Sequence, residues 1–175
     1  MTESNRNRVL WAPWRMGYIM KPEEKGCFLC RLTGKDDFLL YKSRHALAVL
    51  NTYPYNNGHL LVAPAKHKKS LSQLFPEEAE ELYTLLAKSI QILERTMHPH
   101  GFNVGLNLGK CAGAGLQEHF HFHIVPRWQG DTNFMPVTAG VKVIPQSLEE
   151  LWKILKVEFD AIRISNSSPK KHRKR

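Results

Sequence analysis

The clearest alternation of apolar and polar positions runs from Gln117 to Trp128. Aromatic and β-branched residues at every second position predict a β-strand whose apolar side faces a core. Alternate side chains of a strand share a face, so the histidines between them should line the other face. Pro126 has no N–H for a ladder and is expected to end the strand. The aligned histidines are His119, His121 and His123.

Two longer stretches have apolar residues at helical spacing. The first begins at Pro76, which suits a first helical turn, and reaches about Met97, with four glutamates near its start. The second runs from Ser147, the predicted N-cap, to about Ile162. Shorter apolar runs predict strands at Phe38–Lys42, Ala46–Leu50, His59–Ala63 and Phe102–Leu108. Strands and helices without βαβ alternation indicate an α+β fold on an antiparallel sheet.

Length and composition narrow the class of protein. A chain of 175 residues with 42% hydrophobic and 23% charged residues fits one ordinary globular domain. Its apolar runs fall short of the ~20 residues of a membrane span, and its first residues do not resemble a signal peptide. We therefore expect a cytoplasmic protein without a membrane partner.

Positive charge is concentrated at the C-terminal end. The formal net charge is +9, of which residues 170–175 carry +5, leaving +4 for the rest. Together with the Ser- and Asn-rich segment before them, they should form a disordered tail at residues 165–175. This tail is either a solvated end or a weak contact for nucleic acid.

The chain is divided into three predicted parts. An aromatic, proline-broken arm at residues 1–26 precedes the predicted domain at residues 27–164, and the tail follows it.

The three alternating histidines suggest a metal site, a nucleophilic or acid–base site, or a mixture of the two. In a regular strand the outer pair would lie about 13 Å apart, at a rise of about 3.3 Å per residue. Zn–N bonds are about 2.1 Å long, so one ion cannot bind all three. At least one histidine is therefore free for chemistry. A second His-x-His, at His98 and His100, lies in a Pro- and Gly-containing loop and is given no role.

The cysteines and the glycines add two weaker signals. Cys27 and Cys30 have the spacing of two zinc ligands, which is only half a site, and free thiols or a redox pair are the alternatives. Cys111 is interpreted as a loop thiol, and three cysteines in a cytoplasmic chain argue against a disulfide framework. The Gly-rich loop from Gly109 to Gly115 either lets the backbone approach a phosphate or is a plain turn.

Residues 119–125 read His-φ-His-φ-His-φ-φ, where φ is apolar. This stretch, together with Gly58–Pro64 and the Leu50–Asn51 pair before it, resembles the histidine triad (HIT) family of nucleotide hydrolases and transferases. The segment Pro126–Pro136 and the N-terminal Trp-Ala-Pro-Trp-Arg resemble the branch with bacterial diadenosine tetraphosphate phosphorylases and hydrolases. The resemblance implies a five-stranded antiparallel sheet with a long helix, a C-terminal helix, and a homodimer with a continuous ten-stranded sheet.

The resemblance also implies residue roles in cleaving a dinucleoside polyphosphate. His121 would be the nucleophile that attacks the α-phosphorus and forms a nucleotidyl-histidine, which water or another acceptor then resolves. Many family members have Gln-Ser where this chain has Gly115-Leu116, and we expect Gln117 to replace those contacts. The supporting histidines would be His59, His119 and His123. The nucleotide-binding residues would be Asn51 at the ribose, Asn107 at a phosphate, and Gly113, Gly115 and Gln117 in or after the loop.

Zinc-bearing members of the family suggest a metal site. His67 matches a zinc ligand in those proteins, and with Cys27, Cys30 and His119 it would complete a Cys2His2 set of the structural type. His119 would then be unable to donate to a phosphate.

A different class of function is a nucleotide-binding regulatory or adaptor protein whose basic tail contacts nucleic acid. The intact row of histidines counts against it, because binding alone needs no free nucleophile.

Overall fold

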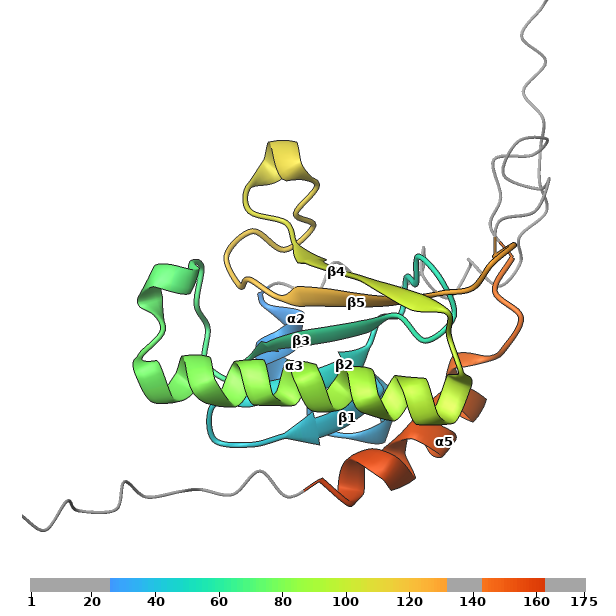
Figure 1. The fold of residues 1–175 in the computed structure, drawn as a ribbon. Coiled ribbons are helices and arrows are strands. Elements are labelled where there is room, and N and C mark those ends of the chain that lie inside the picture. Colours follow the sequence, from blue (N-terminus) through green and yellow to red (C-terminus); the bar gives the residue numbers. More distant parts are fainter. Residues whose placement is uncertain (1–25, 132–142, 163–175) are drawn as a thin grey trace, which may run out of the picture.

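The computed structural model describes residues 26–131 and 143–162, and its centre is a five-stranded antiparallel sheet (Figure 1). The strand order is β1-β2-β3-β5-β4, so β5 lies between β3 and β4. The strands are β1 (Leu39–Lys42), β2 (Ala46–Leu50), β3 (Leu60–Pro64), β4 (Gly101–Leu106) and β5 (Phe122–Arg127). The predicted α+β class with an antiparallel sheet is confirmed.

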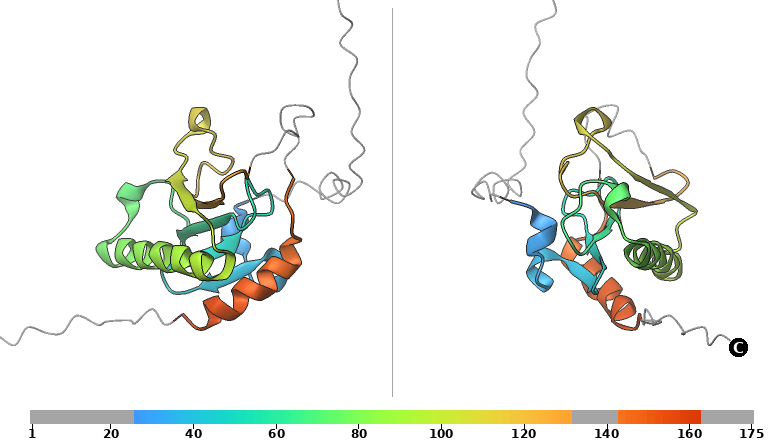
Figure 2. Two further views of the ribbon diagram at one scale, coloured as in Figure 1. Left: turned by 45° about the vertical axis from the view of Figure 1, so that its right-hand side comes forward. Right: turned by 90° about the vertical axis from the view of Figure 1, so that its left-hand side faces the viewer.

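Helices cover both faces of the sheet, with α2 and α3 on opposite sides (Figure 2). The α-helices are α2 (Phe28–Arg31), α3 (Pro76–Met97) and α5 (Leu148–Asp160). Short 3-10 helices are η2 (Lys35–Asp37), η3 (Leu71–Gln73) and η4 (Lys110–Ala112). The long helix and the C-terminal helix agree with the prediction, including Pro76 in the first turn and the Ser147 cap, whose hydroxyl accepts from the Glu150 N–H.

The core follows from the apolar faces of these elements. Strand β2 is buried on both faces: Ala48 packs with the layer under α3 and α5, whereas Leu47 packs with the cluster beneath α2. The predicted stripe on α3 is confirmed, with Leu82, Leu85 and Leu93 buried against the sheet. The two layers pack on opposite faces of the sheet, which positions β3 and the strand β5 that carries His123.

The end predicted for the histidine strand is wrong. Strand β5 continues through Pro126, which pairs with Phe102 of β4, and it begins only at Phe122. The N and C=O groups of one strand residue point to the same side. The Pro126 carbonyl accepts from the side chain of Asn56 at 2.9 Å, on the side where pairing with β3 has already stopped at Ile124. The missing N–H therefore costs no ladder bond.

Several predictions concern residues outside the described ranges. The N-terminal arm at residues 1–26, apart from Gly26, and the basic tail at residues 165–175 are among these. The predicted domain at residues 27–164 contains nearly all of the described chain. Among the helices that are described, none is long and apolar enough to cross a membrane.

Candidate active site

The first histidine of the row faces two cysteines. His119 is fully buried just before β5, and its Nε2–H donates to the Pro64 carbonyl at 3.0 Å. A carbonyl oxygen can only accept, so Nδ1 of this neutral ring carries the lone pair. This Nδ1 lies 3.1 Å from Sγ of Cys27 and 3.5 Å from Sγ of Cys30. Burial lowers the pKa of His119, which favours the neutral ring that a metal ligand must be.

These groups have the geometry of a four-ligand metal site. His67 places its Nδ1 3.4 Å from Sγ of Cys30, and one donor atom from each of the four residues lies within 4.8 Å of the others. Tetrahedral zinc with bonds of about 2.0–2.3 Å requires donor separations of about 3.3–3.8 Å. The described residues thus bring together all four predicted ligands and fit a zinc ion. Cys111, predicted as a loop thiol, is exposed in η4.

The middle histidine has the opposite tautomer. Nδ1 of His121 lies 3.0 Å from the backbone carbonyl of His119, so Nδ1 carries the proton and Nε2 has the lone pair. The side chain is 9% exposed, less than the open face that the alternation predicted, and its ring centroid lies 4.9 Å from that of His123. The His121 ring is surrounded by other imidazoles and by backbone. Because its Nε2 has a free lone pair, this nitrogen can act as a nucleophile.

The third histidine is held by His59, the residue before β3. The Tyr55 backbone N–H donates to Nδ1 of His59 at 3.0 Å, so the proton of this ring lies on Nε2. That Nε2–H donates in turn to Nδ1 of His123 at 2.9 Å. His123 therefore carries its own proton on Nε2. The Tyr55 amide, together with the Asn51 side chain whose Nδ2 lies 3.2 Å from the same Nδ1, thus determines through two rings which nitrogen of His123 is a donor.

Electrostatics keeps both of these rings neutral. Burial, followed by the nearby charges of His123 and His121, lowers the pKa of His59 to about 3. Burial and then His121 lower the pKa of His123 to about 4. Protonation of His59 would place a proton on the nitrogen that accepts from Tyr55 and would break the series of hydrogen bonds. The low pKa values therefore preserve the series at neutral pH.

Tyr55 is a site residue that the sequence did not predict. Its ring centroid lies 4.6 Å from that of His59 and 5.6 Å from that of His123, nearly parallel to the latter at 16°. The tyrosine covers the pair from the solvent side, since its own side chain is exposed. The only signal was an aromatic residue in a turn-rich connector, and the decisive contact comes from its backbone N–H.

The predicted nucleotide-binding residues divide into two groups. Asn51 lies beside the histidines, with Nδ2 3.2 Å from Nδ1 of His59. Asn107 instead donates from Nδ2 to the Gly113 carbonyl at 3.4 Å, across the loop between β4 and β5. Figure 1 shows this loop projecting from the sheet. Gly113 has φ +85°, which favours glycine. Gly115 and Gln117 are exposed in the same loop.

Comparisons with known proteins support this fold and identify its family. The HIT domain family matches residues 33–130. A Mycobacterium tuberculosis protein named AP-4-A phosphorylase is 39% identical over 162 residues, covering 86% of this chain and 83% of that protein. An asymmetrical bis(5'-nucleosyl)-tetraphosphatase of Schizosaccharomyces pombe is 32% identical over 93 residues, covering 53% and 50%.

A solved structure shows the same likeness in three dimensions. The crystal structure of a hypothetical histidine triad nucleotide-binding protein from Sulfolobus tokodaii superposes with a TM-score of 0.61 at 25% identity, covering 77% of this chain and 92% of that one. Sheet, helices and histidine row together define a histidine triad protein. The chain belongs to the HIT family.

Proposed function

We propose that this protein cleaves dinucleoside polyphosphates, such as diadenosine tetraphosphate, at an α-phosphorus through Nε2 of His121. One observation carries the proposal: the His119 carbonyl binds the Nδ1–H of His121 and leaves the lone pair on Nε2. The relative named AP-4-A phosphorylase, which matches most of the chain, supports this class of substrate.

The chemistry follows from the tautomers. Nε2 of His121 attacks the α-phosphorus and forms an N–P bond, while the bond from phosphorus to the bridging oxygen breaks and its electrons leave with the nucleoside polyphosphate. His123 has its Nε2–H available to donate to a phosphoryl or leaving oxygen. Water or inorganic phosphate then attacks the nucleotidyl-histidine and restores the free imidazole.

The products from diadenosine tetraphosphate test this function. Both routes release ATP in the first step. Water as acceptor then yields AMP, whereas phosphate as acceptor yields ADP, so reactions with and without phosphate distinguish hydrolysis from phosphorolysis. We expect ADP when phosphate is present, in line with the name of the Mycobacterium tuberculosis relative. If neither AMP nor ADP appears under either condition, the proposed function is wrong.

The nucleotide contacts belong to the same proposal. Asn51, beside His59, would bind the ribose, and Asn107 with Gly113, Gly115 and Gln117 would contact phosphates from the projecting loop. The position of Asn51 against the histidine pair supports the first role. The left-handed glycine in the loop supports close approach of the backbone to an anion.

We further propose that the cluster of Cys27, Cys30, His67 and His119 holds one structural zinc ion. The donor separations and the lone pair of His119 facing the thiols support this. The ion would supply a cross-link between α2 and the chain entering β5. The protein's own contribution is the Nε2–H bond from His119 to Pro64, which fixes the ring with Nδ1 toward the thiols.

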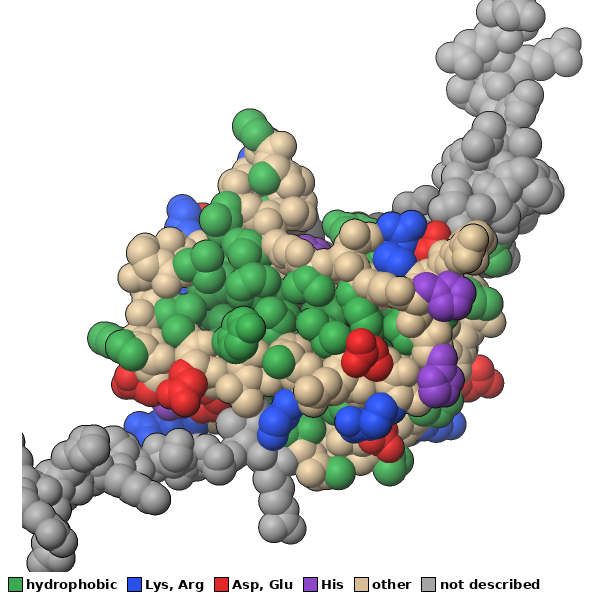
Figure 3. All heavy atoms as spheres, viewed as in Figure 1, with side chains coloured by type: hydrophobic (Ala, Val, Ile, Leu, Met, Phe, Trp, Pro, Cys, Tyr) green, Lys and Arg blue, Asp and Glu red, His purple; other side chains and the backbone are tan. Residues whose placement is uncertain are grey.

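A homodimer is proposed through strand β4, which forms one edge of the sheet. Apolar side chains gather over α3 and β4 on the face seen in Figure 3, and Val104 and Tyr83 are 44% and 73% exposed. Edge strands of two copies could pair into one ten-stranded sheet. Analytical ultracentrifugation of the wild-type protein should give twice the mass of one chain, and the Val104→Arg variant should give the mass of the monomer.

Nucleic-acid binding by the tail and a cytoplasmic location stay predictions.

A further inference from the structure

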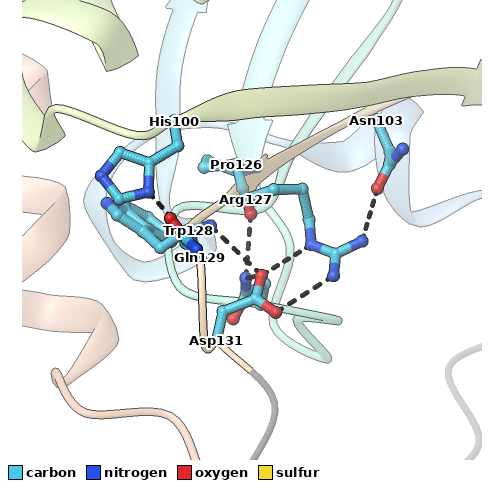
Figure 4. Close-up of polar contacts among 8 residues, drawn as sticks. His100, Asn103, Pro126, Arg127, Trp128, Gln129 and Asp131 are labelled. Atoms are coloured by element: carbon cyan, nitrogen blue, oxygen red, sulfur yellow. Dashed lines mark hydrogen bonds and ion pairs between the residues drawn. The ribbon is translucent and has the colours of Figure 1, made fainter.

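Beyond the end of β5, a buried carboxylate accepts hydrogen bonds from four donor atoms of the described residues. A turn closed by the Asp131 N–H on the Trp128 carbonyl, with Gly130 at φ +78°, brings Asp131 back onto the strand. Its carboxylate accepts from Nε and Nη2 of Arg127 at 2.6 and 3.0 Å and from the Trp128 N–H at 3.3 Å (Figure 4). Only 7% of the Asp131 side chain is exposed. Ionic hydrogen bonds of this kind are stronger than neutral ones.

The fourth donor links this carboxylate to the histidines. Nδ2 of Asn56 donates to Asp131 at 2.8 Å and to the Pro126 carbonyl at 2.9 Å, and the asparagine is 5% exposed. The backbone carbonyl of the same Asn56 accepts from the His59 N–H at 3.2 Å. Asp131 is thereby connected to His59 through one side chain and one peptide group.

The connector at residues 51–58 has little room to compensate for a lost contact. Gly58 has φ +76°, and a Cβ placed there would lie 2.7 Å from Sδ of Met97 and 3.1 Å from Cγ of Pro126. The connector is therefore packed between the end of α3 and β5. In the described residues, the Asn56 amide joins the connector to Asp131 and to the Pro126 carbonyl, and the neighbouring Asn57 donates to Oε1 of Gln146 at 3.2 Å.

We propose that Asp131, acting through Asn56, is a positioning residue that keeps the Tyr55 N–H on Nδ1 of His59. Without the carboxylate, the buried Asn56 amide and the Trp128 N–H each lose an acceptor, and Asn56 keeps only its bond to the Pro126 carbonyl. The connector then shifts, and His59 exchanges between tautomers. His123 loses its fixed Nε2–H, the donor that the reaction needs.

Imidazole tautomers provide a readout that a general loss of stability would not change. In histidine-labelled protein, long-range nitrogen–proton NMR spectra should show His59 and His123 as fixed Nε2–H tautomers in wild type. Asp131→Ala should give averaged signals for both rings. Asn103→Ala is the matched control, because it removes only the 2.7 Å bond to Nη1 of Arg127 and leaves Asp131 on Asn56. Its spectra should match those of wild type.

The catalytic consequence rests on the proposed function and is measured separately. With diadenosine tetraphosphate, Asp131→Ala should lower kcat at least tenfold with KM changed less than threefold. Asp131→Asn keeps an oxygen for Asn56 and should recover part of the loss. If Asp131→Ala does not fold, Asp131→Asn is compared with Asn103→Ala by the same spectra and should show partial averaging.

Two results would overturn the proposal. Fixed tautomers in the folded Asp131 variants would show that the connector is held without the carboxylate. Equal effects of Asn103→Ala and Asp131→Ala would show that Arg127, not the link to Asn56, is responsible. If wild type cleaves no dinucleoside polyphosphate, the proposed function fails, yet the tautomer spectra still decide whether Asp131 positions His59.

Discussion

The two sides of His121 differ although the sequence makes them look alike. On one side, the lone pair of His119 points at two thiols, in a set of four donors that surround a space suited to a metal. On the other side, the lone pair of His123 is taken by the N–H of His59, and the rings are closed against one another. The donors on one side could hold a metal ion, whereas the rings on the other side leave an N–H of His123 to donate.

The middle ring differs from both neighbours in where its own proton lies. His119 and His123 carry theirs on Nε2, whereas the carbonyl of His119 holds the proton of His121 on Nδ1. A carbonyl on the side with the thiols thus fixes the tautomer of His121, the proposed nucleophile, and the side with His59 fixes the tautomer of His123, the proposed donor. Identical residues at identical spacing acquire separate roles from the groups that face each ring nitrogen.

The largest expected effect comes from removing the ring on which both sides converge. His121→Asn should lower turnover of diadenosine tetraphosphate by about 10⁴-fold or more, as for other lost nucleophiles. Substrate binding should persist, measurable by calorimetry. His100→Asn is the control, since that ring accepts from the Gln129 N–H away from the site. Undiminished turnover in His121→Asn would remove the central claim.

Removing a thiol tests the metal-binding side alone. Purified protein should contain about one zinc per chain, and Cys27→Ser should lose it while Cys111→Ser retains it. A metal at 100 times its Kd stabilises the fold by about 2.7 kcal/mol. For a chain of this size, that corresponds to a fall in Tm of about 5–11 °C, measured by calorimetry. Metal-free wild type with an unchanged Tm would contradict the metal site.

A pair of substitutions at His59 tests the opposite side. His59→Gln can keep an N–H near the position of Nε2, whereas His59→Leu cannot donate to His123. The leucine variant should lose about 10²-fold in kcat, the usual size of a general acid–base contribution. The glutamine variant should lose less. Zinc content should be the same in both, and equal activity of the two variants would show that the donor to His123 is unimportant.

The smallest effect is a pH dependence of stability. His59 and His123 have folded-state pKa values of about 3 and about 4, below the ordinary value of about 6.5, so as pH falls the unfolded chain binds protons first. The free energy of unfolding should therefore fall below pH 6.5, by up to about 1.4 kcal/mol per pH unit for each ring. Urea titrations should show a shallower slope for His59→Gln, and an identical slope would contradict the buried neutral ring.

Much of the fold could be predicted from local patterns. The apolar stripe and Pro76 defined α3, and short apolar runs defined the strands to within a few residues. The end of β5 was harder to predict, because Pro126 is tolerated where pairing with β3 has already stopped and where Asn56, far away in the chain, bonds its carbonyl. A local rule about proline cannot include a partner that tertiary structure supplies.

The sequence predicted which residues form the site, but it did not predict the hydrogen bonds between them. Alternation identified the three histidines, and His67 entered only through resemblance, because nothing nearby in sequence connects it to Cys30. Which nitrogen carries each proton depends on the Pro64 and His119 carbonyls and on the Tyr55 amide. Every residue has a backbone carbonyl and every residue except proline an N–H, so no sequence pattern marks the groups that matter.

The strand order has a consequence for synthesis on the ribosome. β1, β2 and β3 are made in succession and are neighbours in the sheet, but the other edge of β3 waits for β5. Until Ile124 has left the exit tunnel, Leu60 has no partner on that side, and the nascent sheet exposes an apolar edge open to misassembly. The strand that carries His123 is thus the last of the five to join the sheet.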